Sequence, residues 1–296
     1  MLTLPQKARR RAWGLILPML IAMALLTLYP LLRTIFLSFT DAQLISNGAF
    51  PHWVGWANYV DALTDPDFQN AFGRSLWFTL LSVALEGVIG VLVALLLNQK
   101  FVGRTCLRVL VILPWALPTI VNAMMWRLNF NPDFGSINAL LTQLGLLDHY
   151  QSWLGDPNRA LYSVMFADIW KNYPLVTLLV LAALQTIPEE LYEAAKVDGI
   201  RAWLRFKSIT LPAIFGPLCA VLVLRTIDAF KIFDIIYAMT RGGPMDSTKT
   251  VSFYVYQQSF TYLEAGSGAA YALLVTLICA ALISLYLLLL RRQSRS

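Results

Sequence analysis

The sequence predicts an all-α protein that crosses a membrane with six helices. Hydrophobic residues make up 58% of its 296 residues, and charged residues make up only 14%. The mean hydropathy of +0.61 lies outside the range of a soluble domain that must present a polar surface to water. The apolar residues gather in runs that reach the roughly 20 residues a helix needs to cross a bilayer. We therefore expect a polytopic integral membrane protein without a separate soluble domain.

The predicted spans follow one another along the chain. In order, they lie near residues 12–36, 72–98, 107–127, 160–185, 213–239 and 266–290. Prolines lie near or inside several of them, and membrane helices tolerate such kinks because neighbouring helices satisfy the freed carbonyl groups. The first run follows three arginines, but no convincing small-residue cleavage site comes after it. We expect this run to remain as the first helix.

Lysine and arginine gather on alternate connections between the spans. The clusters lie within residues 7–11, 100–108, 196–207 and 291–295. Because positive residues flank membrane helices mainly on the cytoplasmic side, we expect both termini and the connection at 186–212 in the cytoplasm. The expected organisation is a cytoplasmic segment 1–11, a six-helix domain 12–290 and a basic cytoplasmic tail 291–296. This sorting accounts for the net charge of +6, so we expect no nucleic-acid partner.

The sequence contains no pattern that predicts catalysis or metal binding. The three cysteines have neither metal-ligand spacing nor the even count of a disulfide framework, and neither histidine lies in a predicted span. The chain also lacks the GxxxxGK[ST] loop that cradles nucleotide phosphates. We therefore expect no catalytic residue, no metal site, no cofactor in this chain and no ATP hydrolysis by it.

The connection at 186–212 is far more polar than the rest of the chain. Pro188, Glu189 and Glu190 suit a helix start, because Pro is accepted in the first turn and the helix dipole favours carboxylates there. Gly199 can adopt the left-handed conformation that ends a helix after Asp198. We expect a second short helix over residues 200–208. These features fit either a surface that docks another protein or an amphipathic loop resting on lipid headgroups.

The spacing within this connection resembles a known motif. Glu193-Ala194-Ala195 is followed after three residues by Gly199, and after nine more by Ile209, one residue and Leu211-Pro212. This resembles the EAA motif, E-A-A-x3-G-x9-I-x-L-P, of permease subunits of binding-protein-dependent ABC importers. In that family the motif forms a cytoplasmic coupling helix that sits in a cleft of the ATPase subunit. The resemblance implies these docking residues: Glu190, Glu193, Ala194, Ala195, Asp198 and Gly199.

Other segments resemble the maltose-type, carbohydrate-importing branch of that family. They are VGWANY at 54–59, LPWALP at 113–118, GSIN at 135–138 and TRGGP at 240–244. The resemblance implies a permease subunit that imports a di- or oligosaccharide through the cell (inner) membrane of a bacterium or archaeon. It implies four partners: a second permease, a dimer of ATPase subunits that bind ATP and Mg, an extracytoplasmic binding protein and the sugar.

Two alternatives stay open beside sugar import. Within the same family, close relatives carry glycerol 3-phosphate or a polyol. In another class, an ion-coupled secondary transporter would use the acidic residues within the spans as a relay. Such a transporter would lose uptake when the ion gradient collapses and keep it when ATP is depleted, and it would leave the polar connection without a purpose.

Charged residues inside the predicted spans are the remaining candidates for function, because each costs about 2.5–3.5 kcal/mol to insert at a helix centre. Residues three apart are neighbours on a helix, so pairs of opposite sign are expected to close locally. The set then forms either a neutral ladder that locks two helices or a polar lining for a solute. The fourth span carries Asp168 and Lys171, and the fifth carries Arg225, Asp228, Lys231 and Asp234.

Counting from Glu193, the resemblance places several of these positions on the sugar contacts of the maltose-type permease. We take Lys231 as a further candidate beside them. Glu86, the one acidic residue in the second span, is either a cavity residue or the partner of a base that the sequence does not identify. The full set of substrate-binding candidates is Asp168, Lys171, Asn172, Arg225, Asp228, Ala229 and Lys231.

Overall fold

The computed structural model describes residues 4–45 and 50–293. For residues 4–12, 285 and 287–293 it describes the backbone only. The described residues form helices, three of which contain a π-helical turn, and they form no strand. The predicted all-α fold is confirmed. The ends of the two predicted cytoplasmic segments, residues 1–3 and 294–296, lie outside the described residues.

The chain divides into two compact units. The first contains the residues up to Asp65 together with Val255–Thr276, and the second contains Pro66–Tyr254 and the residues from Leu277 onward. The helices of the first unit are α1 (Leu4–Met23), α2 (Tyr29–Leu37), α3 (Ala57–Thr64) and the start of α14 (Ala265–Gln293). Within this unit Asn58 of the VGWANY segment donates hydrogen bonds to the carbonyl oxygens of Ser38 and Thr40, both at 2.9 Å, which holds the turn between α2 and α3.

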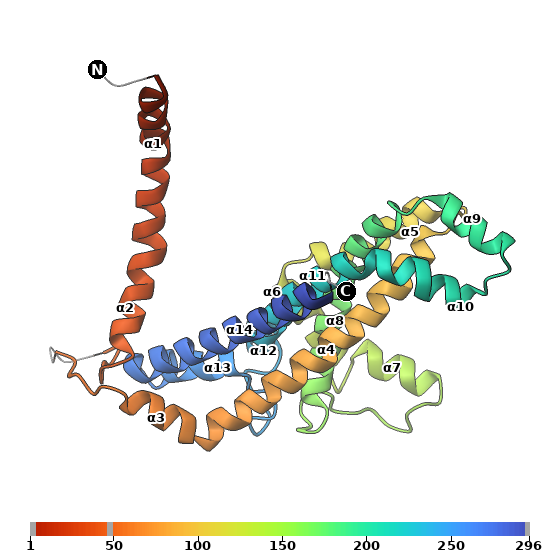
Figure 1. The fold of residues 1–296 in the computed structure, drawn as a ribbon. Helices are drawn as coiled ribbons and strands as arrows, with labels where there is room; N and C mark the ends of the chain where they lie inside the picture. The colour runs from red at the N-terminus through yellow and green to blue at the C-terminus, as the bar shows by residue number, and fades with distance from the viewer. Residues whose placement is uncertain (1–3, 46–49, 294–296) are drawn as a thin grey trace. The chain divides into compact units, whose positions relative to one another are not determined.

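The second unit holds most of the helices (Figure 1). The long ones are α4, α8 and α11, and they pack on one another through two clusters of buried apolar side chains. The shorter helices lie between the long ones or after the last of them along the chain. In chain order the unit contains α4 (Pro66–Asn98), α5 (Arg104–Ala116), α6 (Thr119–Asn129), α7 (Ser136–Gln143), α8 (Ala160–Leu184), α9 (Glu189–Val197), α10 (Ala202–Arg205), α11 (Leu211–Phe230), α12 (Asp234–Met239) and most of α13 (Val251–Tyr256).

Five helical stretches are long and apolar enough to cross a membrane, and a sixth span is formed if one bent helix pair counts as a single crossing. The five are Trp13–Leu37, Pro66–Asn98, Ala160–Leu184, Ala202–Phe230 and Ala265–Ser284. The bent pair is α5 and α6, whose axes differ by 98° at Leu117 and Pro118. The prediction of six spans therefore holds, but the third one is broken. The two residues between α5 and α6 are extended, which ends one helix before the other begins.

The fifth predicted span, 213–239, was wrong as a single helix. The helix ends at Phe230, Lys231 and the next residues leave the helical conformation, and α12 begins at Asp234. At its other end this helix is longer than expected: α10 continues through a π-helical turn, Phe206–Thr210, directly into α11. The predicted stop near Ser208 is therefore also wrong, because Pro212 lies in the first turn of α11, where a missing N–H costs little.

Helices α4 and α8 pack tightly at Gly90. A Cβ atom added to Gly90 would lie 2.6 Å from Cβ of Val176, whereas one added to Gly73 of the same helix would meet nothing within 4 Å. We therefore expect Gly90→Ala to lower the free energy of unfolding by about 1–3 kcal/mol through overpacking. The matched change Gly73→Ala is expected to leave it unchanged or raise it slightly, since Ala favours helix. Thermal unfolding in detergent measures both, and equal shifts would contradict the close contact.

Candidate functional site

Three charged side chains from three different helices meet inside the second unit. Arg225 of α11 donates from Nε to Oε2 of Glu86 at 2.7 Å and from Nη2 to Oε1 of the same carboxylate at 3.0 Å. Its Nη2 also donates to Oδ2 of Asp168 at 3.1 Å. The exposed fractions of the three side chains are 6%, 0% and 6%. We call Glu86, Asp168 and Arg225 the buried triad; it ties α4, α8 and α11 together.

The triad is supported by a neighbouring amide. Asn172, one turn after Asp168 on α8, donates from Nδ2 to Oδ1 of that aspartate at 2.8 Å. Both oxygens of Asp168 thus accept a hydrogen bond, as do both oxygens of Glu86. A hydrogen bond to every carboxylate oxygen lowers the cost of burying these groups in a medium of low dielectric constant.

The predicted local pairing of the span charges is largely wrong. In the described part of the chain, neither Asp168 with Lys171 nor Arg225 with Asp228 forms an ion pair. Arg225 instead pairs across helices, where the two oxygens of Glu86 accept two parallel hydrogen bonds from the planar fork of the guanidinium. Glu86, which the sequence left without an identified base, therefore has its partner here.

Asp228 and Lys231 form the one predicted local pair that is present. Their charged atoms are 3.4 Å apart, and each side chain is 55% exposed. Lys171 is half-buried. The predicted substrate-binding residues therefore fall into two groups. Lys171, Asp228 and Lys231 are accessible, while the other four are buried and committed to packing or to the triad: Asp168, Asn172, Arg225 and Ala229.

The polar connection between α8 and α11 has the predicted first helix and helix end. Helix α9 covers Glu189–Val197, and Gly199 has φ of +71°. The N–H of Gly199 bonds the carbonyl of Lys196 at 3.0 Å, and that of Ile200 bonds the carbonyl of Ala195 at 2.9 Å. These two bonds form a Schellman motif, which a left-handed glycine permits.

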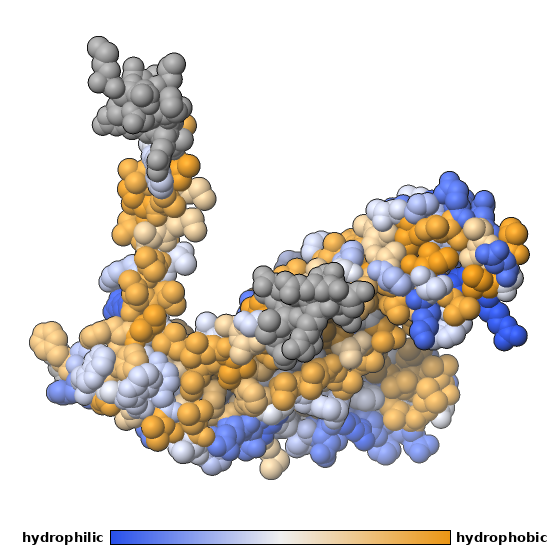
Figure 2. Space-filling model, in the orientation of Figure 1, coloured by the Kyte–Doolittle hydropathy of each residue, from blue (hydrophilic) through white to orange (hydrophobic). Residues whose placement is uncertain are grey.

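The predicted docking residues lie on this helix and its end. Five of them are exposed: Glu190, Glu193, Ala194, Asp198 and Gly199. Ala195 is only 5% exposed and packs against the chain itself. Figure 2 shows hydrophilic residues gathered over α9 and α10 next to the apolar surface of the long helices. The connection therefore presents a polar knob at one end of the second unit, and its helix α9 carries the exposed carboxylates of Glu189, Glu190 and Glu193.

Two contacts that the sequence did not predict hold this knob to the long helices. Lys100, just past the end of α4, lies 3.0 Å from the carboxylate of Glu189, and this ammonium lowers the pKa of Glu189 below its ordinary value. The hydroxyl groups of Tyr192 and Thr210 share a hydrogen bond of 2.9 Å, which joins α9 to the helix that leads into α11. No spacing rule links residues 89 positions apart, so only the basic cluster at 100–108 hinted at the first contact.

Comparison with known proteins identifies the family of this chain. The model of the family described as "Binding-protein-dependent transport system inner membrane component" matches residues 87–295. The trehalose/maltose transport system permease protein MalF of Thermococcus litoralis is 38% identical over 92% of this chain and 91% of its own. The sulfoquinovosyl glycerol transport system permease protein SmoG of Agrobacterium fabrum is 34% identical over 94% of this chain and 90% of its own.

The fold has also been seen in a solved structure. A chain of a bacterial alginate ABC transporter, in complex with an alginate pentasaccharide-bound periplasmic protein, superposes with a TM-score of 0.84. It is 21% identical, and the match covers 98% of this chain and 97% of that one. A likeness at this identity concerns the fold, while the family follows from the sequence matches. This chain belongs to the family of binding-protein-dependent transport system inner membrane components, the permease subunits of ABC importers.

Proposed function

We propose that this chain is the permease subunit of an ATP-driven importer that takes up a carbohydrate delivered by an extracytoplasmic binding protein. The observation that carries the proposal is α9, which presents Glu193 and Ala194 of the EAA pattern on an exposed helix ended by Gly199. The relatives named above support a carbohydrate, since one carries trehalose or maltose and another carries sulfoquinovosyl glycerol by their names.

The proposed assembly has two permeases on a dimer of ATPase subunits. The ATPase subunits bind ATP and Mg, and this chain supplies no catalytic residue. Both termini and α9 face the cytoplasm, where α9 docks in a cleft of one ATPase subunit. Closure of the ATPase dimer on ATP moves α9, and the two permeases change from an inward-open to an outward-open state. The binding protein and the nucleotide bias this equilibrium because they bind the two states unequally.

The solute is proposed to contact the accessible charged residues and not the buried triad. Arg225 has three of its donor contacts filled by Glu86 and Asp168, whereas Lys171, Asp228 and Lys231 remain open to water. Charged donors and acceptors of this kind replace water around the hydroxyl groups of a sugar. Together with exposed Asp234, the accessible span charges are two bases and two acids, and this balance favours a neutral sugar over the second candidate, an anionic solute such as glycerol 3-phosphate.

Uptake into proteoliposomes tests the proposal. The complex of this chain, its second permease and its ATPase subunits is reconstituted with ATP inside the vesicles and loaded binding protein outside. We expect labelled trehalose or maltose to accumulate only with ATP, and ionophores to leave the rate unchanged. Accumulation of glycerol 3-phosphate alone would select the second candidate. Uptake that persists without ATP and collapses with an ionophore would overturn the proposal in favour of ion-coupled transport.

A further inference from the structure

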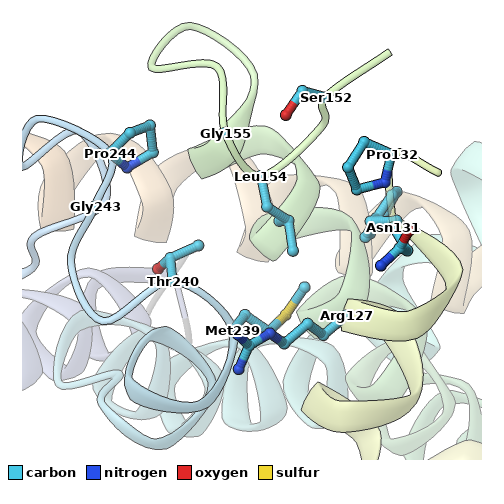
Figure 3. Close-up of a pocket in the computed structure, with 11 residues that line it drawn as sticks. Arg127, Asn131, Pro132, Ser152, Leu154, Gly155, Met239, Thr240, Gly243 and Pro244 are labelled. Atoms are coloured by element: carbon cyan, nitrogen blue, oxygen red, sulfur yellow. The ribbon is translucent and has the colours of Figure 1, made fainter. Parts of the chain in front are cut away.

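A pocket of about 480 Å³ lies within the second unit, and none of the candidate docking or substrate-binding residues lines it. Three segments line it: the end of α6 with the residues after it (127–132), the loop 152–155 before α8, and the end of α12 with the loop after it (239–244). Figure 3 shows Leu154 and Met239 facing each other, with Thr240 and Pro244 on one side and Asn131 and Pro132 on the other. The volume is that of a small-ligand site.

The pocket and α9 lie at opposite ends of α8. Gly155 in the pocket wall precedes the first residue of α8, Ala160, by one short turn, while α9 begins just after the last residue, Leu184. A helix of 25 residues is about 37 Å long, which exceeds the hydrocarbon thickness of a bilayer. If α9 faces the cytoplasm, as proposed, the pocket faces the other side.

Hydrogen bonds hold the walls of the pocket in place. Asn138, which is fully buried, donates from Nδ2 to the carbonyl oxygens of Asn131 at 3.3 Å and Gln151 at 2.9 Å. Its Oδ1 accepts a bond of 2.8 Å from the indole N–H of Trp153. On the opposite wall Thr248 donates to the carbonyl of Gly243 at 2.8 Å. Because these bonds fix its loops, the pocket is preformed. Binding of an occupant therefore costs little conformational entropy in the loops.

The charge of the pocket is unbalanced. Arg127 is the one charged residue among those that line it, and it takes part in none of the ion pairs formed by the described residues. Its single hydrogen bond to the described residues is a long one, 3.4 Å from Nη1 to the carbonyl of Ala238. The guanidinium has five N–H donors, so most of them point to no protein acceptor. A carboxylate is the acceptor that this fork matches best.

We propose that this pocket receives an acidic side chain of the extracytoplasmic binding protein. The proposal rests on the proposed function, which supplies both that partner and the outward orientation. Arg127 pairs with the incoming carboxylate, and the apolar surfaces of Leu154, Met239 and Phe130 receive the aliphatic part of the same side chain. Helix ends and loops form the walls, and Arg127 is exposed, so the pocket is accessible to a protein that lands on this face.

The test is the ATPase activity of the reconstituted complex, titrated with the purified binding protein that stimulates the wild-type complex, at low and high salt. We expect Arg127→Ala to raise the binding-protein concentration for half-maximal stimulation about tenfold or more, since a hydrogen bond to a charged group is lost. Salt should raise this concentration for the wild type and much less for the variant, because exposed charges are screened. Arg127→Lys is expected to lie between them.

Two further variants complete the design. Arg241→Ala removes another exposed arginine from the adjoining loop that does not line the pocket, and it is expected to leave the half-maximal concentration unchanged. Ser152→Glu adds a carboxylate at an exposed position of the pocket wall, so it should repel the acidic side chain and raise that concentration even if Arg127→Ala fails to fold.

The outcomes separate this proposal from the proposed function. If no binding protein stimulates the wild-type complex, the proposed function itself fails. If the wild type is stimulated and neither Arg127→Ala nor Ser152→Glu shifts the half-maximal concentration, the pocket proposal is overturned and the proposed function stands. The variants could instead change only the solute concentration that gives half-maximal stimulation, measured at saturating binding protein. That result would assign the pocket to the solute and would also overturn the proposal.

Discussion

Arg225→Met is expected to lower the free energy of unfolding by about 3–5 kcal/mol, more than any other single change to the charged residues of the spans. The substitution removes the cation that both Glu86 and Asp168 share and leaves two carboxylates buried with 0% and 6% of their side chains exposed. Thermal unfolding of the complex purified in detergent measures the effect.

A neutral replacement of the whole triad is the first control. Glu86→Gln, Asp168→Asn and Arg225→Met together remove every charge, and we expect this triple variant to recover most of the lost stability, because the cost arises from unpaired charge and not from lost volume. Lys231→Met is the second control. It breaks the half-exposed pair with Asp228 and should cost roughly 0–1 kcal/mol. A triple variant as unstable as Arg225→Met would show that the triad matters through its shape and not its charge balance.

The features that the sequence predicted correctly depend on short-range rules. The end of α9 follows from Gly199 alone, since a glycine can take the left-handed conformation that the Schellman bonds require. The spans follow from apolar runs of sufficient length, and most of their limits lie within a few residues of the observed helices. In each case the residues that determine the feature lie close together in the sequence, within the length of about one helix.

The features that the sequence missed depend on contacts between distant helices. Glu86 and Arg225 are 139 positions apart, and no rule of helical spacing connects them. The rule that residues three apart are neighbours predicted the ion pair of Asp228 and Lys231 correctly. Arg225, however, forms its ion pair with Glu86, a bidentate partner on another helix. The end of α11 at Phe230 was also missed, because apolar residues continue on both sides of Lys231 and Asp234.

The contacts around the triad suggest how motion of α9 reaches the middle of the second unit. Helix α8 leads into α9, and α10 leads out of the same connection into α11. The end of α4 is joined to α9 by the ion pair of Lys100 and Glu189. The three helices that meet at the triad are therefore the three that are attached to the polar connection. We expect a displacement of α9 to act on α8 and α11 through the chain itself, and on α4 only weakly, because the ion pair that joins them is exposed.

On this basis Glu193→Ala is expected to reduce ATP-driven uptake by at least about tenfold, since coupling between sites of this kind is typically worth a factor of 5–150. Glu193 is exposed on α9 and lies in none of the ion pairs of the described residues, so its loss should leave thermal unfolding unchanged. The carboxylate instead contributes to the partner surface as an acceptor for a cationic side chain of the ATPase subunit.

The readout is the number of solute molecules taken up per ATP hydrolysed by the reconstituted complex. For Glu193→Ala we expect this ratio to fall, because hydrolysis by the separate ATPase subunits continues while the movement of α9 no longer follows it. Lys196→Ala, at another exposed position on the same helix, serves as the matched control and should keep the wild-type ratio. If Glu193→Ala also keeps that ratio, α9 is not the docking element. The polar connection is then better explained as a loop that rests on lipid headgroups, where its basic residues meet anionic lipid.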